Sequence, residues 1–175
     1  VMVVTDPALV DHVAVTTTLS ALKTAGVAFA LFSATRVEPT DISFQEAIDF
    51  AIDGGFDGYV AVGGGSAIDT AKAANLYATY PAALLTYVNA PIGQAKPVPG
   101  KLQPLVAIPT TAGTGSETTG VAIFDLTSIH AKTGIAHRVG QAGVGVAADE
   151  SVGRGFGQFL DVGAHQRRAQ GAVQA

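Results

Sequence analysis

Short apolar runs alternate with longer segments of helical period along the first part of the chain. Four runs have the length and composition of buried strands: residues 1–5, 27–32, 58–62 and 105–108. Three intervening segments are predicted as helices: residues 8–25, closed by Gly26, residues 43–52, ended by Gly54 and Gly55, and residues 67–78. Because helices separate the strands, right-handed crossovers and a mostly parallel sheet are expected. We therefore predict an α/β fold, Rossmann-like, with helices on both faces of the sheet.

The third predicted strand runs into a glycine triplet, residues 63–65, and then directly into an Ala-rich helix. Backbone N–H groups and a helix N-terminus then face one point, which suits a phosphate. Two common motifs are excluded, because Ile68 stands where a G-x-G-x-x-G fingerprint needs its third glycine and Lys72 lies too far into the helix for a P-loop. Ser66 followed by Asp69 also fits a capping box. A phosphate-binding nest and a plain strand-to-helix turn both stay open.

A second motif follows the last predicted strand. Residues 109–120 (PTTAGTGSETTG) carry several hydroxyl side chains and glycines, which can satisfy phosphate or ribose oxygens without adding charge. A Ser/Thr-rich surface loop is the simpler interpretation of this composition. In a parallel sheet, however, ligands gather at the carboxyl ends of the strands. Both motifs are predicted at that edge, which favours one shared cleft.

The composition narrows the class of protein. At 175 residues, with 48% hydrophobic and 14% charged side chains, the chain is expected to form one globular domain. A net charge of −4 and the lack of a Lys/Arg cluster before the last few residues argue against a nucleic-acid surface. The sequence contains no cysteine, which excludes disulfides and thiolate chemistry, and no apolar run long enough to span a membrane. We expect a soluble protein with small anions as partners, and neither nucleic acid nor membrane.

The two motifs together resemble the signatures of the amino-terminal domain of iron-containing (group III) alcohol dehydrogenases: residues 63–72 (GGGSAIDTAK) and 109–117 (PTTAGTGSE). The resemblance covers residues 1–137. Four further stretches look most like the branch of that family that acts on hydroxy acids and oxo acids: residues 36–40, 73–78, 90–93 and 117–125. The resemblance implies a dehydroquinate synthase-like N-terminal nucleotide-binding domain. The complete enzyme would be an oxidoreductase that moves hydride between a small alcohol or hydroxy acid and NAD.

By this resemblance, the glycine turn and the serine after it hold the cofactor pyrophosphate, and an aspartate lies on the nicotinamide side. The hydroxyl loop lines the adenosine and phosphate part of the cleft. The cofactor-binding residues implied are Gly64, Gly65, Ser66, Asp69, Thr110, Thr111, Thr114 and Ser116. Lys72 either neutralises nearby charge or pairs with Asp69 at the i, i+3 spacing, and we favour the pair.

Two departures from the family pattern affect the cofactor and the metal. Ser33 follows the second strand, where NAD-preferring relatives carry an aspartate for the ribose 2′-hydroxyl, and Arg36 is close behind, so NADP stays open beside NAD. The family's Fe²⁺ or other divalent metal is held by an Asp and three His of a second, helical domain, and no matching segment is present. Surface or capping roles are predicted for the four histidines, which lack the spacing of helical metal ligands: His12, His130, His137 and His165. No catalytic or metal-binding residue is assigned.

The composition changes abruptly at Arg138. All prolines and lysines precede it and most arginines follow it, and neither helix nor strand period persists beyond it. We predict a nucleotide-binding α/β domain over residues 1–137 and a divergent, weakly structured tail over residues 138–175. The chain alone is expected to be catalytically inactive; a non-catalytic nucleotide-binding module and a non-functional truncation are the alternatives. A homodimer, and a cytoplasmic or (in a eukaryote) mitochondrial matrix location, fit the resemblance.

Overall fold

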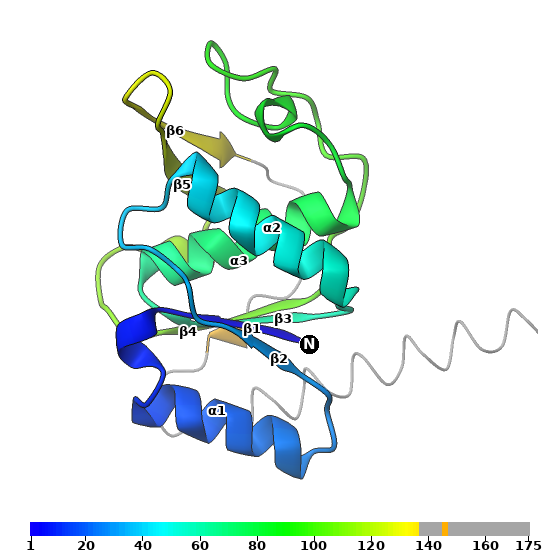
Figure 1. The fold of residues 1–175 in the computed structure, drawn as a ribbon, viewed down its shortest axis with the longest axis vertical. Helices are drawn as coiled ribbons and strands as arrows, with labels where there is room; N and C mark the ends of the chain where they lie inside the picture. Colours follow the sequence, from blue (N-terminus) through cyan, green and yellow to red (C-terminus); the bar gives the residue numbers. More distant parts are fainter. Residues whose placement is uncertain (137–144, 147–175) are drawn as a thin grey trace, which may run out of the picture.

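A five-stranded parallel sheet forms the centre of the molecule (Figure 1). The computed structural model describes residues 1–136 and 145–146. The strands follow the spatial order β2-β1-β3-β4-β7, and every neighbouring pair is parallel. Their bounds are β1 Met2–Thr5, β2 Ala30–Phe32, β3 Tyr59–Gly63, β4 Leu105–Pro109 and β7 Gly145–Val146. The four predicted strands and the parallel α/β fold are thus confirmed.

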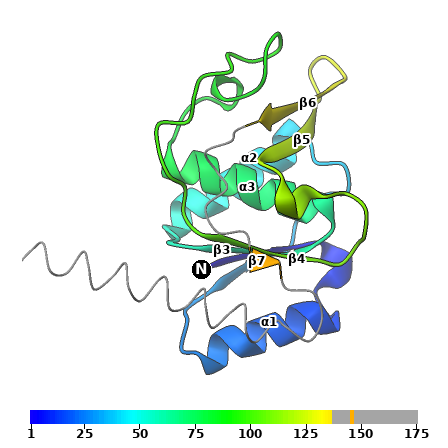
Figure 2. The same cartoon turned by 180° about the vertical axis from the view of Figure 1, so that it is seen from behind.

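Three α-helices cover the two faces of this sheet (Figures 1 and 2). Helix α1 (Val13–Thr24) lies on one face, where Val15 and Leu22 pack against the strands. Helices α2 (Asp41–Gly54) and α3 (Gly65–Thr79) lie on the other face. Helix α2 begins with a capping box between Thr40 and Ser43 and ends at Gly55, whose φ of 57° favours glycine. The predicted helices on both faces of the sheet are confirmed.

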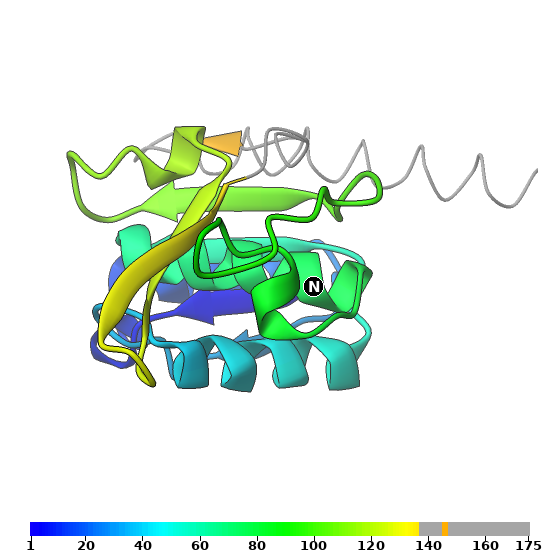
Figure 3. The ribbon, with the colours of Figure 1, turned by 90° about the horizontal axis from the view of Figure 1, so that it is seen from above.

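Helix α3 is buried on almost all sides because a second layer covers it. Its residues Ile68, Ala71 and Ala74 belong to a core that they form with residues of the central sheet. Ala73, Leu76 and Tyr77 of the same helix pack into a second core with the hairpin β5 (Val121–Leu126) and β6 (Ala131–Ala136). Figure 3 shows this antiparallel hairpin lying across the two helices. Helix α3 has apolar residues on both sides because the sheet covers one side and the hairpin covers the other.

The chain around the first helix differs from the prediction of one helix over residues 8–25. A 3-10 helix, η1 (Pro7–Leu9), follows β1 and is capped by Asp6, whose carboxylate accepts from the Ala8 N–H at 2.8 Å. Helix α1 begins only at Val13, where His12 is the N-cap and its Nδ1 accepts from the Ala14 N–H at 3.2 Å. Two side-chain acceptors six residues apart therefore divide the segment into two helices. The predicted surface or capping role of His12 is confirmed.

Two further 3-10 helices lie in the connections, η2 (Leu84–Thr86) and η3 (Ser116–Thr118). Strand β7 pairs its Gly145 and Val146 with Val106 and Ala107 of β4, so these two residues of the predicted tail extend the sheet. The other residues of the predicted tail, 138–144 and 147–175, lie outside the described residues, and its weak structure stays a prediction. In the part that the structure describes, no helix is long and apolar enough to cross a membrane.

Candidate functional site

A cavity among the described residues opens where the chain changes the direction of its crossovers. From β1 the chain crosses one face of the sheet through α1 to β2, and from β3 it crosses the other face through α3 to β4. The connections that leave the carboxyl ends of β1 and β3 therefore go to opposite faces of the sheet, and a cavity of about 850 Å³ lies at this topological switch point. It is lined by residues at the end of β4 and in the segments that follow β1, β2, β3 and β4: Asp6, Ala8, Leu9, His12, Val13, Ala14, Thr17, Val37, Gly64, Gly65, Ser66, Ala67, Ile108, Pro109, Thr110 and Thr111.

The glycine turn after β3 brings bare backbone to this cavity. Gly63 has a φ of 155°, and a Cβ there would lie 2.8 Å from the Ala67 Cβ, so only glycine fits. A Cβ at Gly64 would lie 3.1 Å from Oγ1 of Thr111. A Cβ at Gly65 would lie 3.1 Å from Oγ of Ser116. The glycines therefore allow the two motifs of the sequence to approach each other closely.

The N-terminus of α3 points at the cavity without a side chain to cap it. Its N-cap residue is Gly64, which makes no side-chain capping hydrogen bond. The predicted capping box between Ser66 and Asp69 is therefore wrong, because the helix already begins at Gly65 and the Asp69 carboxylate binds elsewhere. The first N–H groups of a helix lack intrahelical acceptors and carry the positive end of its dipole. Gly64, Gly65 and Ser66 all line the cavity, so this end of α3 can accept an anion.

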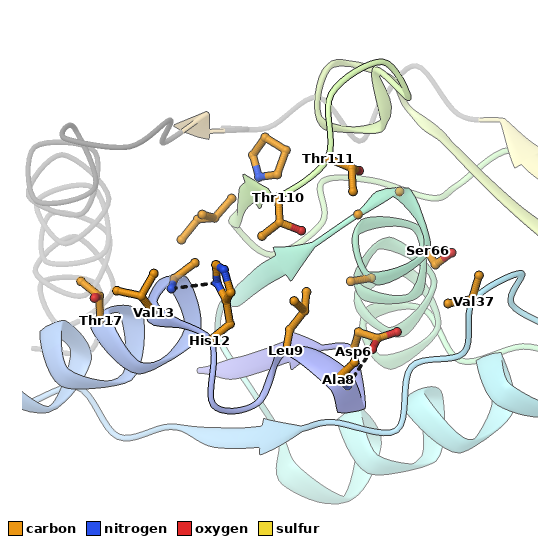
Figure 4. A pocket seen from close by; sticks show the side chains of 16 residues that line it. Asp6, Ala8, Leu9, His12, Val13, Thr17, Val37, Ser66, Thr110 and Thr111 are labelled. Carbon is orange, nitrogen blue, oxygen red and sulfur yellow. Dashed lines mark hydrogen bonds between the residues drawn. The ribbon is translucent and has the colours of Figure 1, made fainter.

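The hydroxyl loop after β4 forms the facing wall. The Thr110 N–H donates to the Gly63 carbonyl at 3.0 Å, which joins the two loops at their start. Thr110 and Thr111 line the cavity beside Ser66 (Figure 4). Thr114 and Ser116 lie further along the loop and do not line the cavity; a Cβ built on Gly65 would lie 3.3 Å from Cβ of Thr114 and 3.1 Å from Oγ of Ser116. Five of the eight predicted residues therefore line the cavity: Gly64, Gly65, Ser66, Thr110 and Thr111. Thr114 and Ser116 lie close to Gly65 but outside the lining.

Asp69, the eighth predicted residue, lies away from the cavity in a buried polar cluster. Its side chain forms an ion pair with Lys72 at 3.3 Å, which confirms the predicted i, i+3 pair. Burial raises the pKa of Asp69, and the Lys72 ammonium, the Ile123 N–H and a hydrogen bond from Ser116 partly offset that rise. Burial likewise lowers the pKa of Lys72, and the nearby carboxylate of Asp69 partly restores it.

Sequence reasoning missed the wall that follows β1. Asp6, Leu9 and His12 line the cavity (Figure 4), and none of the three was predicted as a cofactor-binding residue. A signal was available, because Asp6 follows a buried parallel strand just as Gly64 and Thr110 do. The Asp6 carboxylate is already bound to the Ala8 N–H. The cavity also reaches Val37, in the segment after β2.

Among residues 1–136 and 145–146, no three or more His, Asp or Glu side chains are grouped closely enough to hold a metal ion. His130 lies in the turn between β5 and β6, with a φ of 50°. His137 and His165 lie outside the described residues, and their predicted roles stay predictions.

A doubly wound parallel sheet with its cavity at the switch point defines a class of α/β proteins that bind their ligands at this edge. Residues 1–144 match the family model described as iron-containing alcohol dehydrogenase. The chain therefore belongs to the iron-containing alcohol dehydrogenase family. The family match extends seven residues beyond residue 137, the end of the resemblance recognised in the sequence.

Curated relatives carry the same name in several organisms. A mitochondrial hydroxyacid-oxoacid transhydrogenase of Xenopus tropicalis is 58% identical over 139 residues, which cover 79% of this chain and 30% of that protein. The Homo sapiens protein of that name is 61% identical over 114 residues, covering 65% of this chain and 24% of that one. The chain thus spans less than a third of the length of these relatives.

Solved structures confirm the fold. A 1,3-propanediol oxidoreductase superposes with a TM-score of 0.74 at 30% sequence identity. The match covers 83% of this chain and 37% of the oxidoreductase chain. A sulfoacetaldehyde reductase from Bifidobacterium kashiwanohense, in complex with NAD+, superposes with a TM-score of 0.69 at 27% identity over 83% of this chain and 37% of its own. Both neighbours therefore match this chain with little more than a third of their length.

Proposed function

We propose that this chain is the dinucleotide-binding part of an oxidoreductase that transfers hydride between a hydroxy acid and an oxo acid. The observation that carries the proposal is the cavity at the switch point, where the glycine turn and the hydroxyl loop face each other. The names of the curated relatives support the substrate class. The NAD+ complex of a structural neighbour supports the cofactor.

The residues present fit a dinucleotide. At Gly64 and Gly65 a side chain would crowd the facing loop, so bare backbone can approach a pyrophosphate at the N-terminus of α3. The Ser66, Thr110 and Thr111 hydroxyl groups can donate to phosphate or ribose oxygens from the two walls. When bound, the nicotinamide ring would supply the hydride chemistry. The role of this chain is to hold and orient the cofactor.

The segment after β2 supports acceptance of NADP as well as NAD. The cavity reaches Val37, and the residues between it and β2 include Ser33 and Arg36 but no carboxylate. None of the ion pairs in the described part involves Arg36. A guanidinium group without an acidic partner near the ribose end favours a 2′-phosphate. We propose that NADPH binds with an affinity similar to that of NADH.

The remaining parts of the reaction are proposed to lie outside the described residues. No metal site is formed within them, so we assign the family's divalent metal, and the polarisation of the substrate oxygen, to the rest of a longer protein. The 175-residue chain by itself should then show no turnover of a hydroxy acid such as 4-hydroxybutyrate. The relatives are named as mitochondrial, and we propose the mitochondrial matrix as the location of this protein.

Fluorescence titration with NADH and NADPH tests the proposal. The chain should quench or shift the emission of both cofactors with saturation. Gly64→Ala should weaken both affinities about tenfold or more, because its Cβ enters the space between α3 and Thr111. Gly64 has a φ of −78° that alanine also adopts, so the variant should fold. Ser20→Thr, which adds one methyl group on the exposed side of α1, should bind like the wild type.

The absence of saturable binding to the folded chain would contradict the proposal. Saturable binding without turnover would agree with a chain that supplies only the cofactor half. A non-catalytic nucleotide-binding module, the second candidate, would give the same outcome. Adding the remainder of a relative as a separate chain distinguishes them, because only a half-enzyme should then gain activity.

A further inference from the structure

A lysine side chain that is 13% exposed joins α3 to the two segments that follow β4. The Lys72 ammonium donates to the Ser116 carbonyl at 2.6 Å and to the Val121 carbonyl at 2.7 Å. It also donates to the Asp69 carboxylate at 3.3 Å. All three donor positions of the ammonium are thereby used. Lys72 therefore fixes the end of the hydroxyl loop and the start of β5 against one side of α3.

Asp69 completes this cluster from the same helix. Its second carboxylate oxygen accepts from the Ile123 N–H at 3.1 Å, so both oxygens are bound inside the protein. The residue is 7% exposed, and neither Asp69 nor Lys72 lines the large cavity. The family resemblance implies that Asp69 lies on the nicotinamide side of the site, whereas the carboxylate contacts found here are made within the protein.

We propose that Asp69 and Lys72 are positioning residues, which hold the hydroxyl loop in the geometry that binds the cofactor without touching the cofactor themselves. This inference rests on the proposed function, because it takes the loop as one wall of the cofactor site. Ser116 transmits the effect. Its carbonyl is bound by Lys72, and its Oγ lies 3.1 Å from the place where a Cβ of Gly65 would be.

The energetics of buried polar groups explain why the loop depends on the pair. Without the ammonium, the partly buried carbonyls of Ser116 and Val121 would lose this donor, and the buried Asp69 carboxylate would lose its countercharge, which is costly. The least costly response is for the loop to move toward water, because residues 110–114 at its tip are already exposed. Thr110 and Thr111 would then leave their positions opposite α3. The binding wall, and not only the fold, would be lost.

Hydrogen exchange of the chain without cofactor tests the positioning step independently of binding. Lys72→Met keeps the length of the side chain and removes the charge. It should speed amide exchange in residues 110–123 at least about tenfold, while exchange in α1 stays as in the wild type. Lys72→Arg should restore much of the protection, because it keeps three or more donors and a small void of about 40 Å³ adjoins Lys72. Lys23→Met, the same change at an exposed lysine of α1, is the control.

NADH titration of the same variants then tests the consequence. Lys72→Met should bind NADH about tenfold more weakly at a temperature where circular dichroism shows it folded, and Lys72→Arg should recover most of that loss. Combining Lys72→Met with Thr111→Val should cost less than the sum of the two single changes, because both act through the same loop. If Lys72→Met does not fold, Asp69→Asn takes its place, with the same expected direction.

Unchanged exchange in residues 110–123, or wild-type NADH affinity in folded Lys72→Met, would overturn the inference. Additive effects in the double variant would overturn it as well. A failure of the proposed function would look different, because the wild-type chain itself would then bind no NADH. The hydrogen-exchange experiment would still report whether Lys72 holds the loop.

Discussion

Replacement of Tyr59 by phenylalanine removes a buried hydroxyl group that has no hydrogen-bond partner among residues 1–136 and 145–146. Tyr59 begins β3 and is 0% exposed. Its hydroxyl oxygen is buried with no hydrogen-bond partner among the described residues. The ring packs edge-on against Phe56 with centroids 6.5 Å apart, and phenylalanine keeps this contact. Because an unpaired buried hydroxyl costs about 1–3 kcal/mol, Tyr59→Phe should raise the free energy of unfolding by about that amount at neutral pH.

The same residue predicts a loss of stability at alkaline pH. Burial raises the pKa of Tyr59 from 10.0 to about 12. A raised pKa in the folded state means that the contribution to stability is complete below pH 10 and is lost as the pH rises through about 12. At about 1.36 kcal/mol for each pH unit, the wild type should lose about 1.4 kcal/mol by pH 11 through this residue and about 2.7 kcal/mol in all. Tyr59→Phe should not show this loss.

Urea unfolding at pH 8, 10 and 11, followed by circular dichroism, measures both effects. The variant should be more stable than the wild type at pH 8, and the difference should widen at pH 11. Tyr80→Phe is the matched control, because the Tyr80 hydroxyl donates to the Lys101 carbonyl at 3.1 Å and its loss should slightly lower stability. A Tyr59→Phe variant that is less stable at pH 8, or that loses as much stability as the wild type at pH 11, would refute the reasoning.

Three further predictions concern the site, the hairpin and a helix cap. Gly65→Ala places a Cβ 3.1 Å from the Ser116 Oγ; it should weaken NADH binding and lower stability by about 1–2 kcal/mol, measured by titration and urea unfolding, and unchanged binding would count against the close approach of the loops. Phe124→Ala removes a fully buried ring whose centroid lies 5.0 Å from that of Phe44, and a loss of about 3–5 kcal/mol in urea unfolding is expected. His12→Ala removes the N-cap of α1 and should cost about 0.5–1 kcal/mol in the same assay, with no loss if the cap is dispensable.

The parallel sheet could be predicted from the sequence because its signals are local. Each buried strand is an apolar run, and each helix between strands has enough length for a crossover. The hairpin β5–β6 was not predicted, because its strands are stabilised by α2 and α3 rather than by the central sheet. The break between η1 and α1 was missed because it depends on the side-chain caps Asp6 and His12.

The candidate site was predictable to the extent that it follows strand ends. Gly64, Gly65, Ser66, Thr110 and Thr111 follow β3 and β4, so a parallel sheet brings them together. The position of Asp69 could not be derived, because its partner Ile123 is 54 residues away and belongs to the unpredicted hairpin. Whether a polar residue early in a helix faces the ligand or an internal partner depends on such tertiary contacts.

The central claim is that the N-terminus of α3 and the hydroxyl loop form one dinucleotide site. An NMR titration of the ¹⁵N-labelled chain with NADH measures this most directly. The amide signals of Gly64, Gly65, Ser66 and Thr111 should shift together with one saturation curve, while those of β5 and β6 shift little. Saturable shifts confined to other parts of the chain, with these four amides unmoved, would contradict the account.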